Sequence, residues 1–81
     1  MKLWILTPNV SGGPWKPWYD KAFGFVVRAE TDEDARSMAQ ADGGDETRNG
    51  VPAWTDSKLS SCEEISAYGS REVVMRDFRS A

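Results

Sequence analysis

Few side chains in this sequence could carry out catalysis. The chain contains no histidine, which removes the Ser-His-Asp and Cys-His arrangements, the usual zinc sites and the commonest acid–base group near neutral pH. Cys62 is the single cysteine, and Glu63 and Glu64 follow it. Their negative charges oppose the lowered thiol pKa that a nucleophile requires. We therefore interpret Cys62 as a structural thiol in a strand.

Three further stretches match catalytic or metal-binding motifs only in part. Lys58 precedes two nearby serines, but nothing else supplies the oxyanion hole of a Ser–Lys enzyme. Residues 42–46 place oxygen ligands near glycines without the spacing of an EF-hand calcium loop. Residues 12–14 lack the Gly-Lys-Ser/Thr portion of a phosphate-binding loop. The sequence thus predicts no catalytic residue, no metal site and no cofactor, and the protein is expected not to be an enzyme.

A concentration of acidic residues is the strongest functional signal. Between Glu30 and Glu46, seven acidic residues stand against one basic residue, Arg36, a balance of −6 in a chain whose net charge is −3. The segment is either a solvated helix face with an acidic loop or an acidic patch aimed at a basic partner. The second interpretation predicts these partner-binding acids: Asp32, Glu33, Asp34, Asp42, Asp45 and Glu46.

Large aromatic side chains in the connections could add apolar anchors. Trp15, Trp18 and Tyr19 lie in a Gly- and Pro-rich stretch, and Trp54 lies in a second stretch of little periodicity. Either the first three fold back as a lid over the open side of a small sheet, or one or two of them stay exposed as anchors for a partner, since Trp and Tyr dominate interface hot spots. The binding hypothesis adds Trp15, Trp18 and Trp54 to the acidic set.

A strand followed directly by a capped helix positions the acidic residues. Apolar side chains alternate at period two over residues 23–29, which predicts a strand. Thr31 then predicts a helix N-cap, with Asp34 at the reciprocal position of a capping box. The helix is expected over residues 32 to about 42, ended by the glycine pair 43–44.

Three more segments predict strands. Residues 2–7 carry apolar side chains on both faces, which favours an interior position in the sheet or a covered edge. Residues 60–65 and 73–78 predict a third and a fourth strand, joined by a hairpin turn at residues 68–70. The order strand, strand, helix, strand, strand predicts an α+β fold, with residues 1–81 as a single domain: a small antiparallel sheet of about four strands with one helix on a face.

Charge and composition narrow the expected partners and location. The net charge of −3 argues against direct nucleic-acid binding, which requires a basic face. The apolar run at the N-terminus is too short for a signal peptide or a membrane span, and a lone cysteine fits a reducing compartment. We expect a cytoplasmic protein with no membrane association; the sequence leaves its oligomeric state open.

The block of residues 15–30, the capped acidic helix and the closing Val-Val-Met-Arg-Asp-Phe stretch resemble the small single-domain proteins of phages and mobile elements, anti-CRISPR proteins in particular. The resemblance is one of type, in size, acidity, absence of catalytic residues and compact α+β pattern. It implies a stoichiometric inhibitor in an infected or lysogenic bacterial host. Its partner would be a host protein such as a CRISPR–Cas or other nucleic-acid-binding defence complex, where carboxylates take the place of a nucleic-acid backbone.

The leading hypothesis is therefore a non-catalytic acidic binding protein of viral or mobile-element type. Two alternatives stay open. One is a small-molecule or nucleotide binder that uses the loop aromatics for stacking and Arg28 or Arg76 for an anion. The other is a self-associating accessory subunit.

Overall fold

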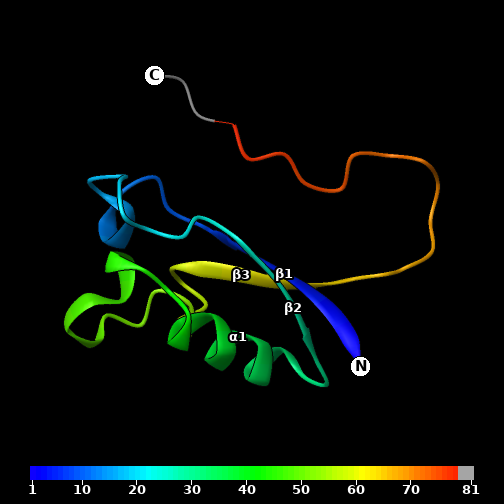
Figure 1. The fold of residues 1–81 in the computed structure, drawn as a ribbon, viewed down its shortest axis with the longest axis horizontal. Coiled ribbons are helices and arrows are strands. Elements are labelled where there is room, and N and C mark those ends of the chain that lie inside the picture. The colour runs from blue at the N-terminus through cyan, green and yellow to red at the C-terminus, as the bar shows by residue number, and fades with distance from the viewer. Residues whose placement is uncertain (79–81) are drawn as a thin grey trace.

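The computed structural model describes residues 1–78, which form a three-stranded sheet with one α-helix on a face. The elements in chain order are β1 (Lys2–Pro8), the 3-10 turn η1 (Gly13–Trp15), β2 (Phe25–Ala29), α1 (Asp32–Ala41), the 3-10 segment η2 (Asp45–Gly50) and β3 (Ser60–Ile65). The strands are antiparallel in the order β2-β1-β3 (Figure 1). The predicted class, a small antiparallel α+β fold with one helix, is confirmed.

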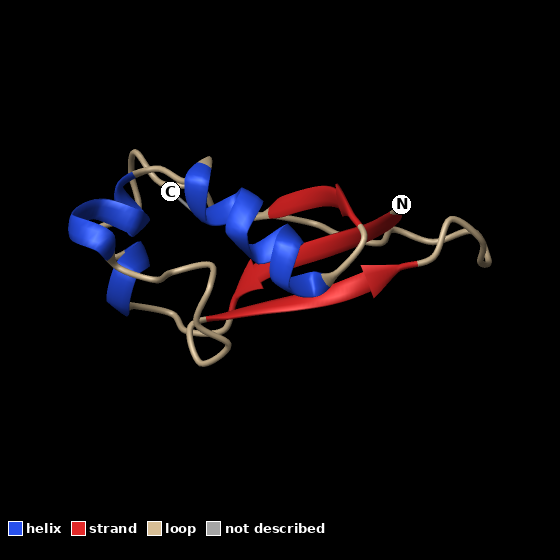
Figure 2. Ribbon diagram, turned by 90° about the horizontal axis from the view of Figure 1, so that it is seen from below, coloured by secondary structure: helices blue, strands red, loops and turns tan. Residues whose placement is uncertain are grey.

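The central strand is β1, in agreement with its two apolar faces. Leu6 pairs with Phe25 of β2 on one side and with Cys62 of β3 on the other. Because side chains alternate along a strand, these three residues share the face covered by α1 (Figure 2). Leu3 and Ile5 lie on the opposite face, which we call the open face because no helix covers it.

Local sequence signals place α1. The Thr31 hydroxyl accepts a hydrogen bond from the amide of Asp34 at 3.2 Å, as expected of an N-cap. Ala35 and Ala39 are fully buried, and their small side chains let the helix lie close to the sheet. The helix ends at Ala41 with Asp42 as its C-cap, one residue before the expected glycine pair.

Arg36 connects α1 to β3 and to the preceding connection. Its guanidinium donates to the carbonyl of Trp54 at 3.0 Å, to the Ser60 hydroxyl at 3.0 Å and to the Ser60 carbonyl at 3.1 Å. Ser60 is completely buried. The only base of the acidic segment is therefore turned inward, and its hydrogen bonds satisfy interior oxygen atoms that would otherwise be costly to bury.

The second half of the core is aromatic and comes from the connections. Trp54 is 0 % exposed, and its ring packs edge-to-face on Trp15 at 5.2 Å and on Phe25 at 5.0 Å between centroids. The indole of Trp15 donates to the carbonyl of Ala22 at 2.8 Å. The two long connections are thus held against one end of the sheet, where η1 and η2 lie side by side (Figures 1 and 2).

The predicted fourth strand does not form. After β3 the chain turns outward, and residues 73–78 pass over the open face without strand pairing (Figure 1). The described residues thus contain three strands, and the expected hairpin turn at 68–70 is part of a wide loop. The prediction relied on the local strand preference of Val73, Val74 and Phe78, whereas a strand also requires packing against its neighbours. These three side chains stay exposed, and Met75 alone approaches Gly24 of the sheet region.

Candidate protein-binding surface

Glu46 is not on the surface, so its prediction as a partner-binding residue is wrong. The residue is only 1 % exposed. One carboxylate oxygen accepts from the amides of Ala22 and Gly44, both at 3.0 Å, and the other accepts from the indole Nε1 of Trp54 at 2.6 Å. A buried carboxylate is stable only when it is well hydrogen-bonded. Glu46 therefore links three segments of the chain inside the molecule.

Two of the three predicted aromatic anchors are also interior. Trp15 is 3 % exposed and Trp54 is 0 % exposed, and they pack on each other. Both predictions as anchors are wrong, because the small core takes up these rings as its largest apolar groups. Trp15 does fold back, although it packs beside Trp54 and not over the open face. Trp18 is the one predicted anchor that stays exposed.

Two adjacent glycines bring the loop before β2 against η2. A Cβ at Gly44 would lie 2.6 Å from the carbonyl oxygen of Asp20, and one at Gly43 would lie 2.9 Å from a carboxylate oxygen of Glu46. The amide of Asp45 donates to the same Asp20 carbonyl at 2.9 Å. The backbone around Gly43 and Gly44 comes so close to its neighbours that only glycine fits at these positions. This close contact places the backbone of Asp20 next to that of Asp45.

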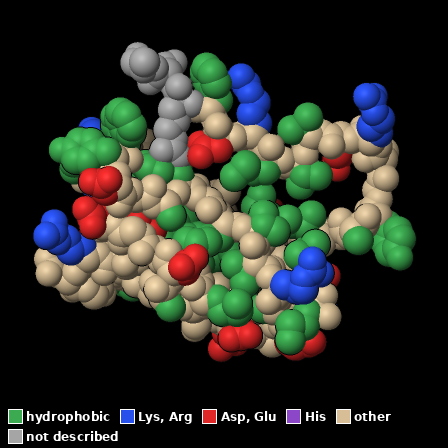
Figure 3. Space-filling model, in the orientation of Figure 1, with side chains coloured by type: hydrophobic (Ala, Val, Ile, Leu, Met, Phe, Trp, Pro, Cys, Tyr) green, Lys and Arg blue, Asp and Glu red, His purple; other side chains and the backbone are tan. Residues whose placement is uncertain are grey.

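An exposed aromatic pair stands beside these acids. Trp18 is 66 % exposed and Tyr19 is 61 % exposed, and their rings meet edge-to-face at 6.3 Å. Asp20 follows directly and is hydrogen-bonded through its carbonyl to Asp45. Figure 3 shows large hydrophobic side chains beside acidic ones at the left end of the molecule. We name the aromatic–acidic surface by its residues: Trp18, Tyr19, Asp20, Asp42 and Asp45.

The exposed acids form two groups. Asp32, Glu33 and Asp34 occupy the first turn of α1, and Asp42 and Asp45 follow its last turn. A helix of ten residues, at about 1.5 Å per residue, separates the two groups by about 15 Å. All five are exposed, and within residues 1–78 none of them forms an ion pair. The second group alone is joined to exposed aromatic rings.

The sequence analysis considered Tyr19 as an exposed ring but did not include Tyr19 or Asp20 among the partner-binding residues. Asp20 adopts a positive φ of 60°, and its position next to Asp45 depends on a contact between residues 25 positions apart. The neighbouring Lys21 directs its ammonium group to the carbonyl of Pro17. A signal was present in the Tyr-Asp pair that follows Trp18, since Tyr shares the interface preference of Trp.

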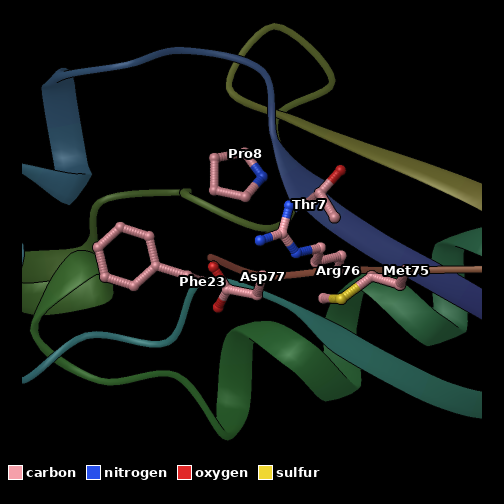
Figure 4. Close-up of a pocket in the computed structure, with 6 residues that line it drawn as sticks. All are labelled: Thr7, Pro8, Phe23, Met75, Arg76 and Asp77. Carbon is pink, nitrogen blue, oxygen red and sulfur yellow. The ribbon is translucent and has the colours of Figure 1, made fainter. Parts of the chain in front are cut away.

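The two arginines considered for a small-ligand site, Arg28 and Arg76, lie apart. A cavity of about 290 Å³ lies between the end of β1 and the C-terminal segment, and Figure 4 shows the guanidinium of Arg76 turned toward Thr7 and Pro8 within it. Arg28 pairs with Leu3 at the other end of β1. The two arginines therefore do not share one anion site, and the buried Trp15 and Trp54 are not available for stacking, whereas Trp18 and Tyr19 are exposed.

The comparisons add no relative. No family model, curated protein or solved structure matches this chain. Across residues 1–78, no group of three or more His, Cys, Asp or Glu side chains is arranged to hold a metal ion. The same residues include no helix with the length and apolar character needed to cross a membrane.

Cys62 lies on the face of β3 that α1 covers, with its sulfur 3.9 Å from the carbonyl of Asp32. Burial raises the pKa of the Cys62 thiol above its ordinary value; the Arg36 charge lowers it in part, and the Asp32 charge raises it further. A raised pKa means that less thiolate is present at any given pH. This agrees with the structural role expected from the sequence.

Alkylation of Cys62 by iodoacetamide at pH 8 is expected to be slower in the native protein than in urea. The reason is that only the thiolate reacts, and the folded protein holds the neutral form to higher pH. Both rates should rise with pH, and the rate in urea should level off first, near the ordinary thiol pKa of about 8.5, while the rate in the native protein continues to rise. Mass spectrometry of the alkylated chain measures both rates. Equal native and unfolded rates across this range would contradict the assignment.

Proposed function

We propose that this protein is a non-catalytic binding protein that uses the aromatic–acidic surface to contact a basic region of a partner protein. The observation that carries the proposal is the exposed Trp18–Tyr19 pair, which is followed directly by Asp20, whose backbone carbonyl accepts a hydrogen bond from the amide of the exposed residue Asp45. Exposed aromatic rings in water are unfavourable for a monomer and are enriched at binding hot spots. Carboxylates beside them select a partner with Lys and Arg side chains.

The frame beneath this surface supports the proposal. The Glu46 carboxylate and the Asp45–Asp20 hydrogen bond tie the loop that carries Trp18 to η2. A loop held in this way has less conformational entropy to lose when a partner binds, which favours affinity. The surface is therefore built on the buried network, although the network itself contacts no partner.

The partner chemistry that fits is a groove lined by Lys and Arg, as in a protein that binds nucleic acid. Two acidic groups about 15 Å apart along α1 offer such a groove two contact zones, one with aromatic anchors and one without. This supports the hypothesis of a phage or mobile-element inhibitor that occupies the nucleic-acid channel of a CRISPR–Cas or other defence complex. The protein would then act in the cytoplasm of the bacterial host.

The proposal is tested by competition with DNA on a panel of purified bacterial CRISPR–Cas effector complexes and other nucleic-acid-binding defence complexes. The wild-type protein is expected to displace labelled target DNA from one of them at low salt. The double variant Asp42→Lys with Asp45→Lys is expected to weaken this inhibition about 100-fold, because the two new lysines would repel the partner's cations. The control is the double variant Glu63→Lys with Glu72→Lys. It changes the net charge by the same amount as the Asp42 and Asp45 pair, on exposed residues outside the aromatic–acidic surface.

Measuring inhibition at low and at high salt separates the contribution of the aromatic rings from that of the charges. Trp18→Ala with Tyr19→Ala should weaken inhibition at both low and high salt, whereas the effect of the Asp variants should shrink as salt screens the charges. The proposal is wrong if no complex in the panel is inhibited, or if the control pair weakens inhibition as much as the Asp42 and Asp45 pair.

A further inference from the structure

The outer edge of β2 forms one wall of a groove. β2 is the end strand of the order β2-β1-β3, and the hydrogen bonds that the structure gives residues 25–29 all join β2 to β1. The outward backbone groups of β2 therefore have no hydrogen-bond partner within residues 1–78. A strand edge of this kind is a template for pairing with another extended segment.

The other wall of the groove is α1. Only two residues separate β2 from α1, so the helix runs back along the strand. A cavity of about 340 Å³ lies between them, and its apolar lining includes Val27, Met38 and Ala39. Met38 is 47 % exposed, and Figure 3 shows hydrophobic side chains gathered near the centre of the view, over β2 and α1. A groove between a strand edge and a helix fits an extended segment whose alternate side chains point toward the helix.

Charged residues of opposite sign line the two ends of this groove. Asp42 follows the last turn of α1 and lines the cavity together with Phe25, the first residue of β2. Arg28 lines it three residues further along the strand, which is about 10 Å away. Both charged residues are exposed, and neither forms an ion pair within residues 1–78. A complementary ligand therefore offers a base near Phe25 and an acid near Arg28.

We propose that this groove binds an extended segment of a partner protein, which adds a strand antiparallel to β2. The segment reads, from its N-terminus, acid, apolar residue, any residue, base. The acid lies opposite Arg28 on the open face, because Arg28 pairs with Leu3. The apolar residue lies opposite Val27 on the face that α1 covers, and the base lies opposite Phe25 on the same face, next to Asp42. Each side chain thus falls on the face that carries its partner.

Neither the chain's own C-terminal segment nor a second copy is the expected occupant. The C-terminal segment passes over the open face, away from α1 (Figure 1), and Met75 lies against Gly24 there. In a two-fold pairing of two β2 strands centred on Val27, Arg28 meets Val26 and finds no acid. A partner segment of the stated charge pattern fits the groove better.

The groove shares one residue, Asp42, with the aromatic–acidic surface. The strand edge and the apolar wall at Met38 are not part of that surface. The inference therefore goes beyond the proposed function and does not depend on it.

Fluorescence anisotropy with labelled hexapeptides tests the proposal on the full-length chain. The first probe, Thr-Glu-Val-Thr-Lys-Thr, has the stated pattern, and the second, Thr-Lys-Val-Thr-Glu-Thr, exchanges its two charges at equal composition. The first probe is expected to bind the wild-type protein with saturation between about 1 µM and about 1 mM. The second should bind about tenfold more weakly, because it sets like charges against Arg28 and Asp42.

Two variants place the probe in the groove. Arg28→Glu should weaken binding of the first probe about tenfold and favour a third, Thr-Lys-Val-Thr-Lys-Thr, in which lysine replaces the acid. Met38→Glu should weaken binding of every probe, because it puts a charge in the apolar wall while it keeps a good helix former in α1. The matched control Val73→Glu changes an exposed apolar residue outside the groove and should leave affinity unchanged. Trp18→Ala with Tyr19→Ala should also leave it unchanged, so the proposed function and this inference fail separately.

Amide hydrogen exchange of β2, followed by NMR, tests the strand pairing itself. Alternate amides within residues 25–29 face outward, and these should gain protection when the first probe is bound. The proposal is overturned if the first probe does not bind at about 1 mM, if Arg28→Glu and Met38→Glu leave its affinity unchanged, or if it binds without protecting alternate amides of β2. Sedimentation velocity of the free protein should show a monomer. A dimer that Met38→Glu dissociates would show that a second copy occupies the groove, which also overturns the proposal.

Discussion

Replacing Trp54 with alanine is expected to lower the free energy of unfolding by about 3–5 kcal/mol, as for other large aromatic residues removed from a core. Trp54 is 0 % exposed and packs on Trp15 and Phe25, so its removal leaves a cavity between three segments. It also removes the indole donor of Glu46. Because small domains are stable by only about 5–15 kcal/mol, a large fraction of the variant should be unfolded at moderate urea concentrations.

Far-UV circular dichroism during urea denaturation measures this change without depending on tryptophan fluorescence. The matched control is Trp18→Ala, which removes the same side chain from an exposed position. The control should change stability by less than about 0.5 kcal/mol. Equal denaturation midpoints for Trp54→Ala and the wild type would show that Trp54 is not part of the core.

The isosteric change Glu46→Gln is expected to cost about 2–4 kcal/mol of folding free energy. The two carboxylate oxygens accept from three N–H donors. An amide offers one oxygen and one NH2 group, so at least one of these N–H groups faces another donor and loses its partner in the interior. Leaving a buried polar group unpaired costs about 1–3 kcal/mol, and more where the lost partner was charged.

The neighbouring change Asp45→Asn is the control for Glu46→Gln, because Asp45 is exposed and uses its backbone amide for its contact with Asp20. Its expected cost is below about 0.5 kcal/mol. Combining Glu46→Gln with Trp54→Phe should cost less than the sum of the single changes, because the two residues share a hydrogen bond. Strict additivity would contradict a direct interaction between them.

The parts of the fold that local rules specify were predicted well. The Thr31 cap depends on residues three positions apart, and the helix begins at Asp32 as expected. The strand at residues 60–65 was predicted with its observed bounds. The apolar faces of β1 indicated an interior position or a covered edge, and β1 is the central strand. Each of these signals lies within a few residues of the element that it specifies, so tertiary contacts were not required to read it.

The candidate site was predicted less well because burial of polar and aromatic residues depends on distant partners. Glu46 has the same sequence signature as Asp45, an acid in a glycine-flanked loop, but only Glu46 meets the indole of Trp54 and the amide of Ala22. Trp15 and Trp18 are equally indistinguishable by local sequence. One fills the core and the other is exposed, since the loop turns between them.

The position of β1 in the sheet also sets an order of events during synthesis. The central strand is made first, and β2 can join it as a hairpin once residue 29 has emerged from the ribosome. Its other neighbour, β3, comes only at residues 60–65, and the carbonyls that receive Arg36 belong to residues 54 and 60. Because long-range contacts must wait for both partners, the nascent chain keeps one edge of β1 unpaired for most of its translation. Chaperone binding to nascent chains from which β2 but not β3 has emerged would therefore centre on β1.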